Sequence, residues 1–193
     1  MHDIVTKTRL RAELLENRAD LGDEARSAAG RSLRDALLAV PEVEMAGTIA
    51  AYVSVGTEPE TRSLLFALWK RGAYVLLPRL LPDDDLDWAS YEGPDSLAPG
   101  ARGLLEPTEP PRGTGAVASA DVVLVPALAV DRTGMRLGRG GGSYDRVLAR
   151  VGPAILTVGL LYDSELVDSV PAEPHDRRVR AAATPSEGLV RFG

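Results

Sequence analysis

A glycine-rich segment with the sequence RLGRGGGSYDR runs from Arg136 to Arg146, where a helix is expected to begin. Glycine adopts backbone angles that other residues avoid, so successive N–H groups of this segment are free to turn toward one point. The helix that follows adds unpaired N–H groups and the positive end of its dipole. Two arginines, Arg136 and Arg139, add guanidinium groups whose geometry suits phosphate oxygens. The segment therefore predicts a phosphate-binding loop.

The glycine pattern differs from the two best-known nucleotide-binding motifs. Its glycines are Gly138, Gly140, Gly141 and Gly142. No Lys-Ser/Thr pair follows them, as a Walker A loop requires, and Ser143 takes the place of the third glycine of GxGxxG. A flexible turn with solvated arginines is the alternative interpretation. The two arginines and the helix start favour phosphate binding over such a turn.

Two aspartates are candidates for holding a metal ion beside a bound phosphate. Asp145 lies in the first turn of the expected helix, and Asp176 lies in the segment PAEPHDRRV. One or two carboxylates, together with phosphate oxygens, are the usual ligands of Mg²⁺. Each aspartate also has a simpler explanation, because Asp145 complements the helix dipole and Asp176 is able to pair with Arg177 or Arg178.

Further candidate ligand contacts lie on the first helix and after the first strand. Lys7 and Arg11 are four residues apart and share one helix face, where an anion would offset their repulsion. Lysine occurs otherwise only at Lys70, which indicates a need for a compact ammonium group at Lys7. Glu58 follows an expected strand and either helps to start a helix or accepts hydrogen bonds from a ligand. A solvated helix surface is the simpler alternative for the two cations.

Composition excludes several classes of protein. The chain has 193 residues, of which 45% are hydrophobic and 26% charged, as in ordinary globular domains. Cysteine is absent, which excludes disulfides, thiolate metal sites and a cysteine nucleophile. The histidines, His2 and His175, are too few for a histidine-rich metal site. The net charge of −6 argues against general nucleic-acid binding.

The length of the chain and its lack of targeting signals predict the number of domains and the location of the protein. No apolar run approaches the roughly 20 residues that span a bilayer, and the N-terminus lacks the apolar core of a signal peptide. We therefore expect a single domain over residues 1–193, in a cytoplasmic monomer without nucleic-acid or membrane partners.

Hydrophobic periodicity and turn residues predict alternating strands and helices. We expect helices over residues 4–21, 23–40, 57–72 and 143–151, and a short helix over 164–167. We expect strands over 48–55, 73–78, 86–91, 121–131, 154–163 and 178–185, with a loop over 92–118 and Trp88 packed in the core. This alternation is typical of an α/β fold with a mainly parallel sheet. Ligands of such sheets bind at the carboxyl ends of the strands, where Glu58 and the glycine loop both fall.

Six segments of the chain resemble, in order, the 5-formyltetrahydrofolate cyclo-ligase family, also called 5,10-methenyltetrahydrofolate synthetases. They are KTRLR, IAAYVSVGTEPET, VLLPRLLPDDDLDWASY, LLEPT, DVVLVPALAVDRTGMRLGRGGGSYDR and VPAEPHDRRV. They extend along nearly the whole chain, and the part from VPALAVD to YDR is the most specific. The resemblance implies a three-layer α/β/α fold.

The resemblance also implies an ATP- and Mg²⁺-dependent enzyme that forms 5,10-methenyltetrahydrofolate from 5-formyltetrahydrofolate and releases ADP and phosphate. In this reaction ATP phosphorylates the formyl oxygen, N10 of the folate attacks the activated carbon, and phosphate leaves. Phosphoryl transfer requires mainly positioning and charge neutralisation from the protein. A glycine loop flanked by arginines suits that work.

The resemblance assigns roles to residues of this chain. It implies ATP contacts at Lys7, Thr8, Arg9, Leu10, Arg11, Arg136, Leu137, Gly138, Arg139, Gly140, Gly141, Gly142, Ser143 and Tyr144. It implies folate contacts at Val53, Glu58, Arg139, Gly140, Gly141, Gly142 and Ser143. It implies magnesium ligands at Asp145 and Asp176, and catalytic roles for Arg136, Arg139 and Lys7.

One position departs from the family pattern. The family usually has Tyr-Tyr-Asp after the glycines, whereas this chain has Ser143, Tyr144 and Asp145. The missing ring would have supplied apolar contact area, so weaker folate binding is expected. Ser143 is instead a candidate helix N-cap.

Two other functions remain open at this point. One is a non-catalytic relative that binds a nucleotide or a folate. The other is a sugar-phosphate isomerase or transferase that binds a single phosphate in the loop, needs no ATP, and uses Asp131 or Glu58 as a general base. An ATP-dependent rise in methenyl-folate absorbance separates these functions from the cyclo-ligase.

Overall fold

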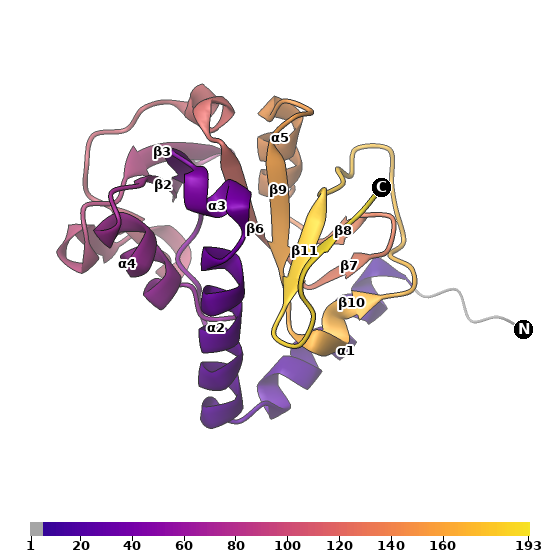
Figure 1. The fold of residues 1–193 in the computed structure, drawn as a ribbon. Coiled ribbons are helices and arrows are strands. Elements are labelled where there is room, and N and C mark those ends of the chain that lie inside the picture. Colours follow the sequence, from indigo (N-terminus) through magenta and orange to yellow (C-terminus); the bar gives the residue numbers. More distant parts are fainter. Residues whose placement is uncertain (1–5) are drawn as a thin grey trace, which may run out of the picture.

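A seven-stranded sheet forms the centre of the computed structural model, which describes residues 6–193 (Figure 1). The strands are β1 (Thr48–Ala50), β2 (Tyr74–Leu80), β3 (Leu86–Ser90), β6 (Val122–Pro126), β9 (Leu156–Leu160), β11 (Ala181–Thr184) and β12 (Gly188–Arg191). Their order is β12-β11-β9-β6-β1-β2-β3. The five central strands are parallel, and β3 and β12 are antiparallel edges. The predicted α/β fold with a mainly parallel sheet is therefore confirmed.

The remaining elements surround this sheet. The helices are α1 (Lys7–Asp20), α2 (Asp23–Leu38), α3 (Pro41–Met45), α4 (Arg62–Lys70) and α5 (Ser143–Arg150), and the short 3₁₀ turns include η3 (Thr114–Ser119) and η4 (Asp163–Glu165). A small sheet has the order β10 (Leu166–Val167), β7 (Ala129–Asp131) and β8 (Arg136–Leu137). A hairpin consists of β4 (Leu97–Pro99) and β5 (Leu105–Pro107).

Alternating apolar residues of the central strands supply two cores, one on each face of the sheet. Ile49 packs with α2 and α4 on one face, whereas its neighbour Ala50 packs with α5 and η3 on the other. Successive strand residues point to opposite faces, and a parallel sheet therefore needs helices on both. The result is the three-layer arrangement that the family resemblance implies (Figure 1). Trp88 is fully buried in the second core, as predicted.

Helix α1 lies against the small sheet and places its first residues beside the glycine loop. Leu10 and Leu14 pack in a separate apolar cluster with Met135 and Leu137, so these residues form the apolar stripe of the helix. Thr6 caps α1 by accepting a hydrogen bond from the backbone N–H of Arg9. The first five residues, which include His2 and the start of the predicted helix, lie outside the described residues.

Two predicted strands are wrong in extent, and both corrections matter for the site. The strand expected over residues 48–55 ends at Ala50, because the Tyr52 carbonyl accepts a hydrogen bond from the Thr61 hydroxyl instead of joining a ladder. The run expected over 121–131 divides into β6 and β7, which belong to different sheets. At the break, the Leu128 N–H donates to the Leu137 carbonyl.

Other boundaries differ because tertiary contacts override local patterns. Helix α4 begins at Arg62 instead of near Pro59, and Pro41 starts the short helix α3 as well as ending its predecessor. The predicted loop over 92–118 contains the β4–β5 hairpin, and β12 follows the last predicted strand. The strand expected over 154–163 is limited to β9, and the short helix expected over 164–167 is the turn η4 followed by β10.

Candidate functional site

A cavity of about 800 Å³ lies at the carboxyl ends of the central strands. Residues after β1 and β6 and at the end of β2 contribute to its wall, together with the start of α1, the glycine loop and the first turn of α5. Glu58 and the glycine loop, which are about 80 residues apart in sequence, both line it. Ligands of open α/β sheets bind at this edge. The cavity is therefore the candidate functional site.

The glycine loop connects β8 to α5 in a conformation that glycine permits. Gly140 has a φ of 109° and Gly142 a φ of 72°, values that side chains rarely tolerate. Gly142 is the N-cap of α5, so the prediction that Ser143 caps this helix is wrong. Ser143 is the first helical residue, and the free N–H groups of the first turn lie on the cavity wall.

Arg136 lies on the cavity wall, where its buried positive charge has few hydrogen-bond acceptors. Its side chain is 4% exposed, and its guanidinium donates to the Pro126 carbonyl at 3.1 Å and to Asp145 Oδ1 at a long 3.5 Å. Its Nε has no hydrogen-bond partner among the described residues. Burial lowers the pKa of the Arg136 guanidinium. A buried cation with so little compensation is expected to attract an anion.

A compact loop after β1 directs Glu58 toward the cavity. Ser54 and Thr61 exchange two hydrogen bonds between backbone N–H groups and side-chain hydroxyls, at 2.9 and 3.1 Å, which closes this loop. Within it, Glu58 Oε2 accepts the Val55 N–H at 2.9 Å, while Oε1 lies 3.7 Å from Nε of Arg139. Burial raises the pKa of Glu58. The carboxylate is thus positioned to accept further hydrogen bonds from a ligand, and it does not start a helix.

Lys7, at the start of α1, also lines the cavity and forms ion pairs with two carboxylates. Its Nζ lies 2.6 Å from Glu173 Oε2 and 2.6 Å from Asp176 Oδ2. Burial lowers the pKa of Lys7, but the hydrogen bonds and charges of Asp176 and Glu173 outweigh this and raise it above its usual value. Asp176 thus pairs with Lys7, whereas the sequence suggested Arg177 or Arg178.

The two predicted metal ligands lie on neighbouring segments. Asp145 Oδ1 accepts the backbone N–H of Arg177 at 2.9 Å, which brings α5 next to the segment that carries Asp176. Both carboxylates line the cavity, and ligand atoms of Glu173, His175 and Asp176 lie within 4.8 Å of one another. The carboxylate oxygens beside the glycine loop are the kind of ligand that a hard divalent cation such as Mg²⁺ prefers.

Most residues implicated by the sequence meet at this cavity. Those that line it are Lys7, Thr8, Arg11, Val53, Glu58, Arg136, Leu137, Gly138, Arg139, Gly140, Gly141, Gly142, Ser143, Tyr144, Asp145 and Asp176. Two of the residues that the family resemblance implicates do not contribute to the wall that the structure describes. Leu10 packs in the apolar cluster beneath α1, and Arg9 lies on the exposed side of this helix.

Several wall residues were not identified from the sequence. Tyr52 and Arg18 line the cavity, as do the apolar side chains of Pro78, Leu80, Leu86, Leu104 and Leu105. Leu104 and Leu105 come from the β4–β5 hairpin, which was predicted as a loop. The sequence signal for Arg18 was its position on the apolar stripe of α1, four residues after Leu14, where a charge is unusual.

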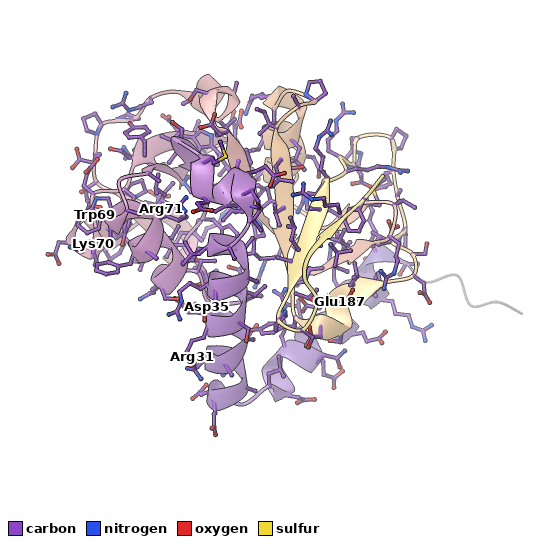
Figure 2. The ribbon with its side chains drawn as sticks, viewed as in Figure 1. Arg31, Asp35, Trp69, Lys70, Arg71 and Glu187 are labelled. Carbon is purple, nitrogen blue, oxygen red and sulfur yellow. The ribbon has the colours of Figure 1, made fainter. Side chains whose placement is uncertain are left out.

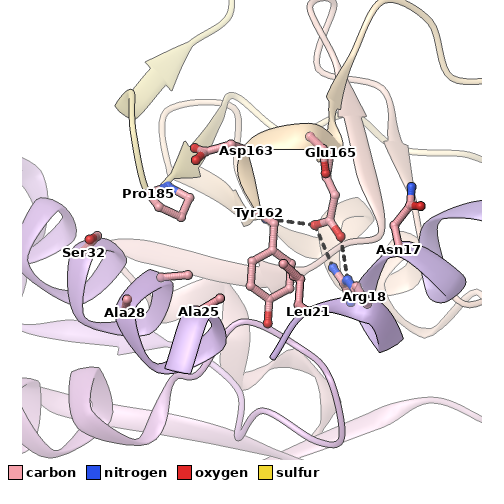
Figure 3. A pocket seen from close by; sticks show the side chains of 12 residues that line it. Asn17, Arg18, Leu21, Ala25, Ala28, Ser32, Tyr162, Asp163, Glu165 and Pro185 are labelled. Atoms are coloured by element: carbon pink, nitrogen blue, oxygen red, sulfur yellow. Dashed lines mark hydrogen bonds and ion pairs between the residues drawn. The ribbon is translucent and has the colours of Figure 1, made fainter. Parts of the chain in front are cut away.

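A second cavity of about 490 Å³ (Figure 3) shares Arg18 as a lining residue with the first. Its wall includes Ala25 and Ala28 of α2 and Tyr162 beside η4. Arg18 and Glu165 form a two-point ion pair there, at 2.6 and 2.9 Å, and each side chain is 2% exposed. Arg18 also donates to the Ala127 carbonyl at 2.7 Å. The ion pair therefore holds α1 and η4 together between the two cavities.

Asp131 does not line the site and has a structural role instead. Its Oδ1 accepts hydrogen bonds from the Thr133 hydroxyl and from the N–H groups of Thr133 and Met135, and its Oδ2 accepts the Val170 N–H. Burial alone would raise its pKa, but these hydrogen bonds hold the pKa of Asp131 below its usual value. Because Asp131 is buried away from the cavity wall, it is not placed to act as a general base on a ligand in this cavity.

Replacing Asp131 with asparagine is expected to lower the free energy of unfolding by about 2 kcal/mol at pH 7, because an amide nitrogen then faces a backbone N–H. A carboxyl group with a depressed pKa stabilises the fold above its unfolded pKa of about 3.9 and loses this contribution as the pH falls further. Urea unfolding at pH 7 and pH 3 measures both effects. A difference between the two proteins that stays constant over this range would contradict the prediction.

A family model and several characterised relatives match this chain. The model described as the 5-formyltetrahydrofolate cyclo-ligase family matches residues 3–185. The 5-formyltetrahydrofolate cyclo-ligase of Mycolicibacterium smegmatis is 40% identical over 191 residues, which cover 96% of each chain. The enzyme of the same name from Escherichia coli is 32% identical over 179 residues, which cover 89% of this chain and 96% of the relative.

Solved structures show the same fold. The 5,10-methenyltetrahydrofolate synthetase of Aquifex aeolicus superposes with a TM-score of 0.84 and 28% identity, over 97% of this chain and 93% of that protein. The synthetase of Mycoplasma pneumoniae has a TM-score of 0.73 at 20% identity, over 92% of this chain and 98% of that protein, and is similar in fold. Among the described residues, no helix is long and apolar enough to cross a membrane.

Proposed function

The chain belongs to the 5-formyltetrahydrofolate cyclo-ligase family, and on this premise we propose that it uses ATP and Mg²⁺ to convert 5-formyltetrahydrofolate into 5,10-methenyltetrahydrofolate, ADP and phosphate. The relatives named above support the ligase and its folate substrate. The requirement for ATP and Mg²⁺ is our inference from the residues of the cavity.

The observation that carries the proposal is the buried guanidinium of Arg136 beside the glycine loop. It combines a poorly compensated positive charge with the unpaired N–H groups at the start of α5. A Cβ atom on Gly138 would lie 2.7 Å from Nη1 of Arg136, so a side chain at this position would displace the guanidinium. Such a combination suits the β- and γ-phosphates of a nucleotide.

Residues of the chain provide the positioning that this reaction requires. Arg136 and Arg139 would neutralise negative charge on the transferred phosphoryl group, with Lys7 and Arg11 on the facing helix. Glu58 would accept hydrogen bonds from N–H groups of the pterin ring and orient N10 toward the formyl carbon. The apolar wall around Leu104 would exclude water from the activated intermediate.

Asp145 and Asp176 are the residues proposed to hold Mg²⁺. When bound, the ion would neutralise phosphate charge and fix the orientation of the triphosphate. Both carboxylates already accept hydrogen bonds from protein donors. A metal ion would therefore compete with these donors for the oxygens that they occupy, Oδ1 of Asp145 and Oδ2 of Asp176.

An absorbance assay on the purified protein tests the proposal. We expect methenyl-folate absorbance to rise when 5-formyltetrahydrofolate, ATP and Mg²⁺ are all present, and to stay flat when ATP is omitted or EDTA is added. ATP binding without turnover would instead indicate a non-catalytic relative. Turnover of a sugar phosphate without ATP would indicate the isomerase or transferase function.

Introducing tyrosine at Ser143 is expected to lower the KM for 5-formyltetrahydrofolate about threefold to tenfold, since part of an aromatic ring becomes buried against the substrate. Ser143 is half-buried and lines the cavity, which gives the new ring access to it. Steady-state kinetics with each substrate varied in turn measure the effect. The KM for ATP should not change, and Ser143→Ala serves as the control without a ring. An equal or higher folate KM for Ser143→Tyr would refute this explanation.

A further inference from the structure

The ammonium group of Lys7 occupies the space between two carboxylates that face the cavity. Both Nζ–O distances are 2.6 Å, to Glu173 and to Asp176, and the Asp176 side chain is only 8% exposed. Nε2 of His175 lies 3.7 Å from the other oxygen of Asp176. In this state Asp176 Oδ2 is already bound to a cation that belongs to the chain.

The same carboxylate is proposed above to bind a divalent cation, and the two cations compete for it. An ammonium group 2.6 Å from Oδ2 already takes up this oxygen, and its charge repels a metal ion on either oxygen of the carboxylate. A metal ion that binds Asp176 through Oδ2 therefore has to displace Lys7, and one that binds through Oδ1 is weakened by the nearby positive charge. Lysine suits such an exchange, because its charge is a point at the end of a flexible four-carbon chain.

A bound nucleotide offers Lys7 another anionic partner within the same cavity. Lys7 and Arg11 both line the cavity that contains the glycine loop. Arg11 is already bound there, because its Nε donates to the Gly138 carbonyl at 2.8 Å. Lys7 is the member of this pair whose partners are carboxylates, and phosphate oxygens would compete for it.

We propose that Lys7 holds Asp176 as an internal cation until nucleotide phosphate draws its ammonium group away, so that Lys7 couples nucleotide binding to divalent-cation binding at Asp176. This inference rests on the proposed function for the identity of the nucleotide. It makes Lys7 a positioning residue whose release prepares the metal site. Without nucleotide, the protein then binds free divalent cations weakly.

Binding of Mn²⁺ without nucleotide or folate tests the competition directly. We expect Lys7→Met to bind Mn²⁺ about tenfold more tightly than the unmodified protein, as measured by calorimetry or by the electron paramagnetic resonance of free Mn²⁺. The double variant Lys7→Met/Asp176→Asn should lose this gain. Equal Mn²⁺ affinity of Lys7→Met and the unmodified protein would overturn the proposal.

A matched control separates specific competition from the general loss of a positive charge. Arg11→Met removes one charge from the same face of α1, yet Arg11 contacts Gly138 and not Asp176. We expect its Mn²⁺ affinity to stay within about twofold of that of the unmodified protein. A gain as large as that of Lys7→Met would show that the local field, and not Lys7 itself, limits metal binding.

Nuclear magnetic resonance of the lysine side chains follows the release of Lys7. The chain contains two lysines, so its side-chain ammonium spectrum has two signals to assign. Figure 2 shows the other, Lys70, with Trp69 and Arg71 at the end of α4, far from the start of α1. Adding ADP in the presence of EDTA should shift the Lys7 signal and leave Lys70 unchanged. Bound ADP with an unmoved Lys7 signal would contradict the coupling.

These measurements remain informative if the proposed reaction is wrong. The Mn²⁺ experiment contains neither nucleotide nor folate, and the ADP experiment needs no turnover. A protein without methenyl-folate formation but with tighter Mn²⁺ binding by Lys7→Met would refute the proposed function and retain the competition. The reverse result would retain the function and refute the competition.

Discussion

The Arg136→Met variant is expected to lose about 100-fold to 1,000-fold in kcat while its free energy of unfolding stays the same or increases. The loss follows because the guanidinium neutralises charge on the transferred phosphoryl group, and removing one such donor typically has an effect of this size. The stability result follows because the folded protein compensates this buried cation poorly, with a carbonyl at 3.1 Å and a carboxylate at 3.5 Å. Methionine fills much of the same volume without desolvating a charge.

Absorbance kinetics and urea unfolding together check this prediction. Arg146→Met is the matched control, since Arg146 lies in α5 directly after the glycine loop, is exposed, and donates to the Asp83 carbonyl away from the cavity. We expect its kcat to stay within about twofold of the unmodified value. An Arg136→Met protein that keeps more than a tenth of the activity would exclude the proposed role of this guanidinium.

Replacing Glu165 with glutamine is expected to have the largest effect on stability, a loss of about 3–5 kcal/mol in the free energy of unfolding. The substitution leaves the Arg18 guanidinium buried with its charge uncompensated, because its remaining acceptors, the Ala127 carbonyl and the glutamine amide oxygen, are both neutral (Figure 3). Native domains are stable by only about 5–15 kcal/mol, so this loss is readily detected by urea unfolding.

A double variant shows whether the loss comes from the unpaired charge. Arg18→Met/Glu165→Leu removes both charges and replaces them with apolar side chains of similar size. We expect it to recover to within about 2 kcal/mol of the unmodified protein. A double variant less stable than Glu165→Gln would show that the ion pair itself, and not the cost of an unmatched cation, supports the contact between α1 and η4.

Local signals in the sequence were sufficient for the fold class and for the glycine loop that lines the candidate site. Alternating apolar residues such as Ile49 and Ala50 face opposite cores, so the pattern identified strands that are covered on both sides. The glycines before Ser143 were correctly interpreted as a turn into a helix, because Gly140 and Gly142 adopt angles that other residues avoid.

The predicted boundaries of helices and strands were wrong where a contact with a residue distant in sequence determines the backbone conformation. The run over residues 121–131 looks continuous by periodicity, yet it divides because Leu128 pairs with Leu137 and Ala127 accepts a hydrogen bond from Arg18. The start of α4 moved because the Thr61 hydroxyl bonds to the Tyr52 carbonyl. A single sequence records no signal for partners of this kind.

The sequence by itself determined a chain of alternating strands and helices with a glycine loop that ends at a helix start, since periodicity and turn chemistry are local properties. Only the tertiary structure decided which charges meet. Lys7 pairs with Asp176, which is 169 residues away in the sequence, and Arg18 pairs with Glu165, which is 147 residues away. The buried charge of Arg136 has few partners at the cavity wall. The reason is that pairing between side chains depends on how the layers pack, and spacing along the chain does not encode that packing.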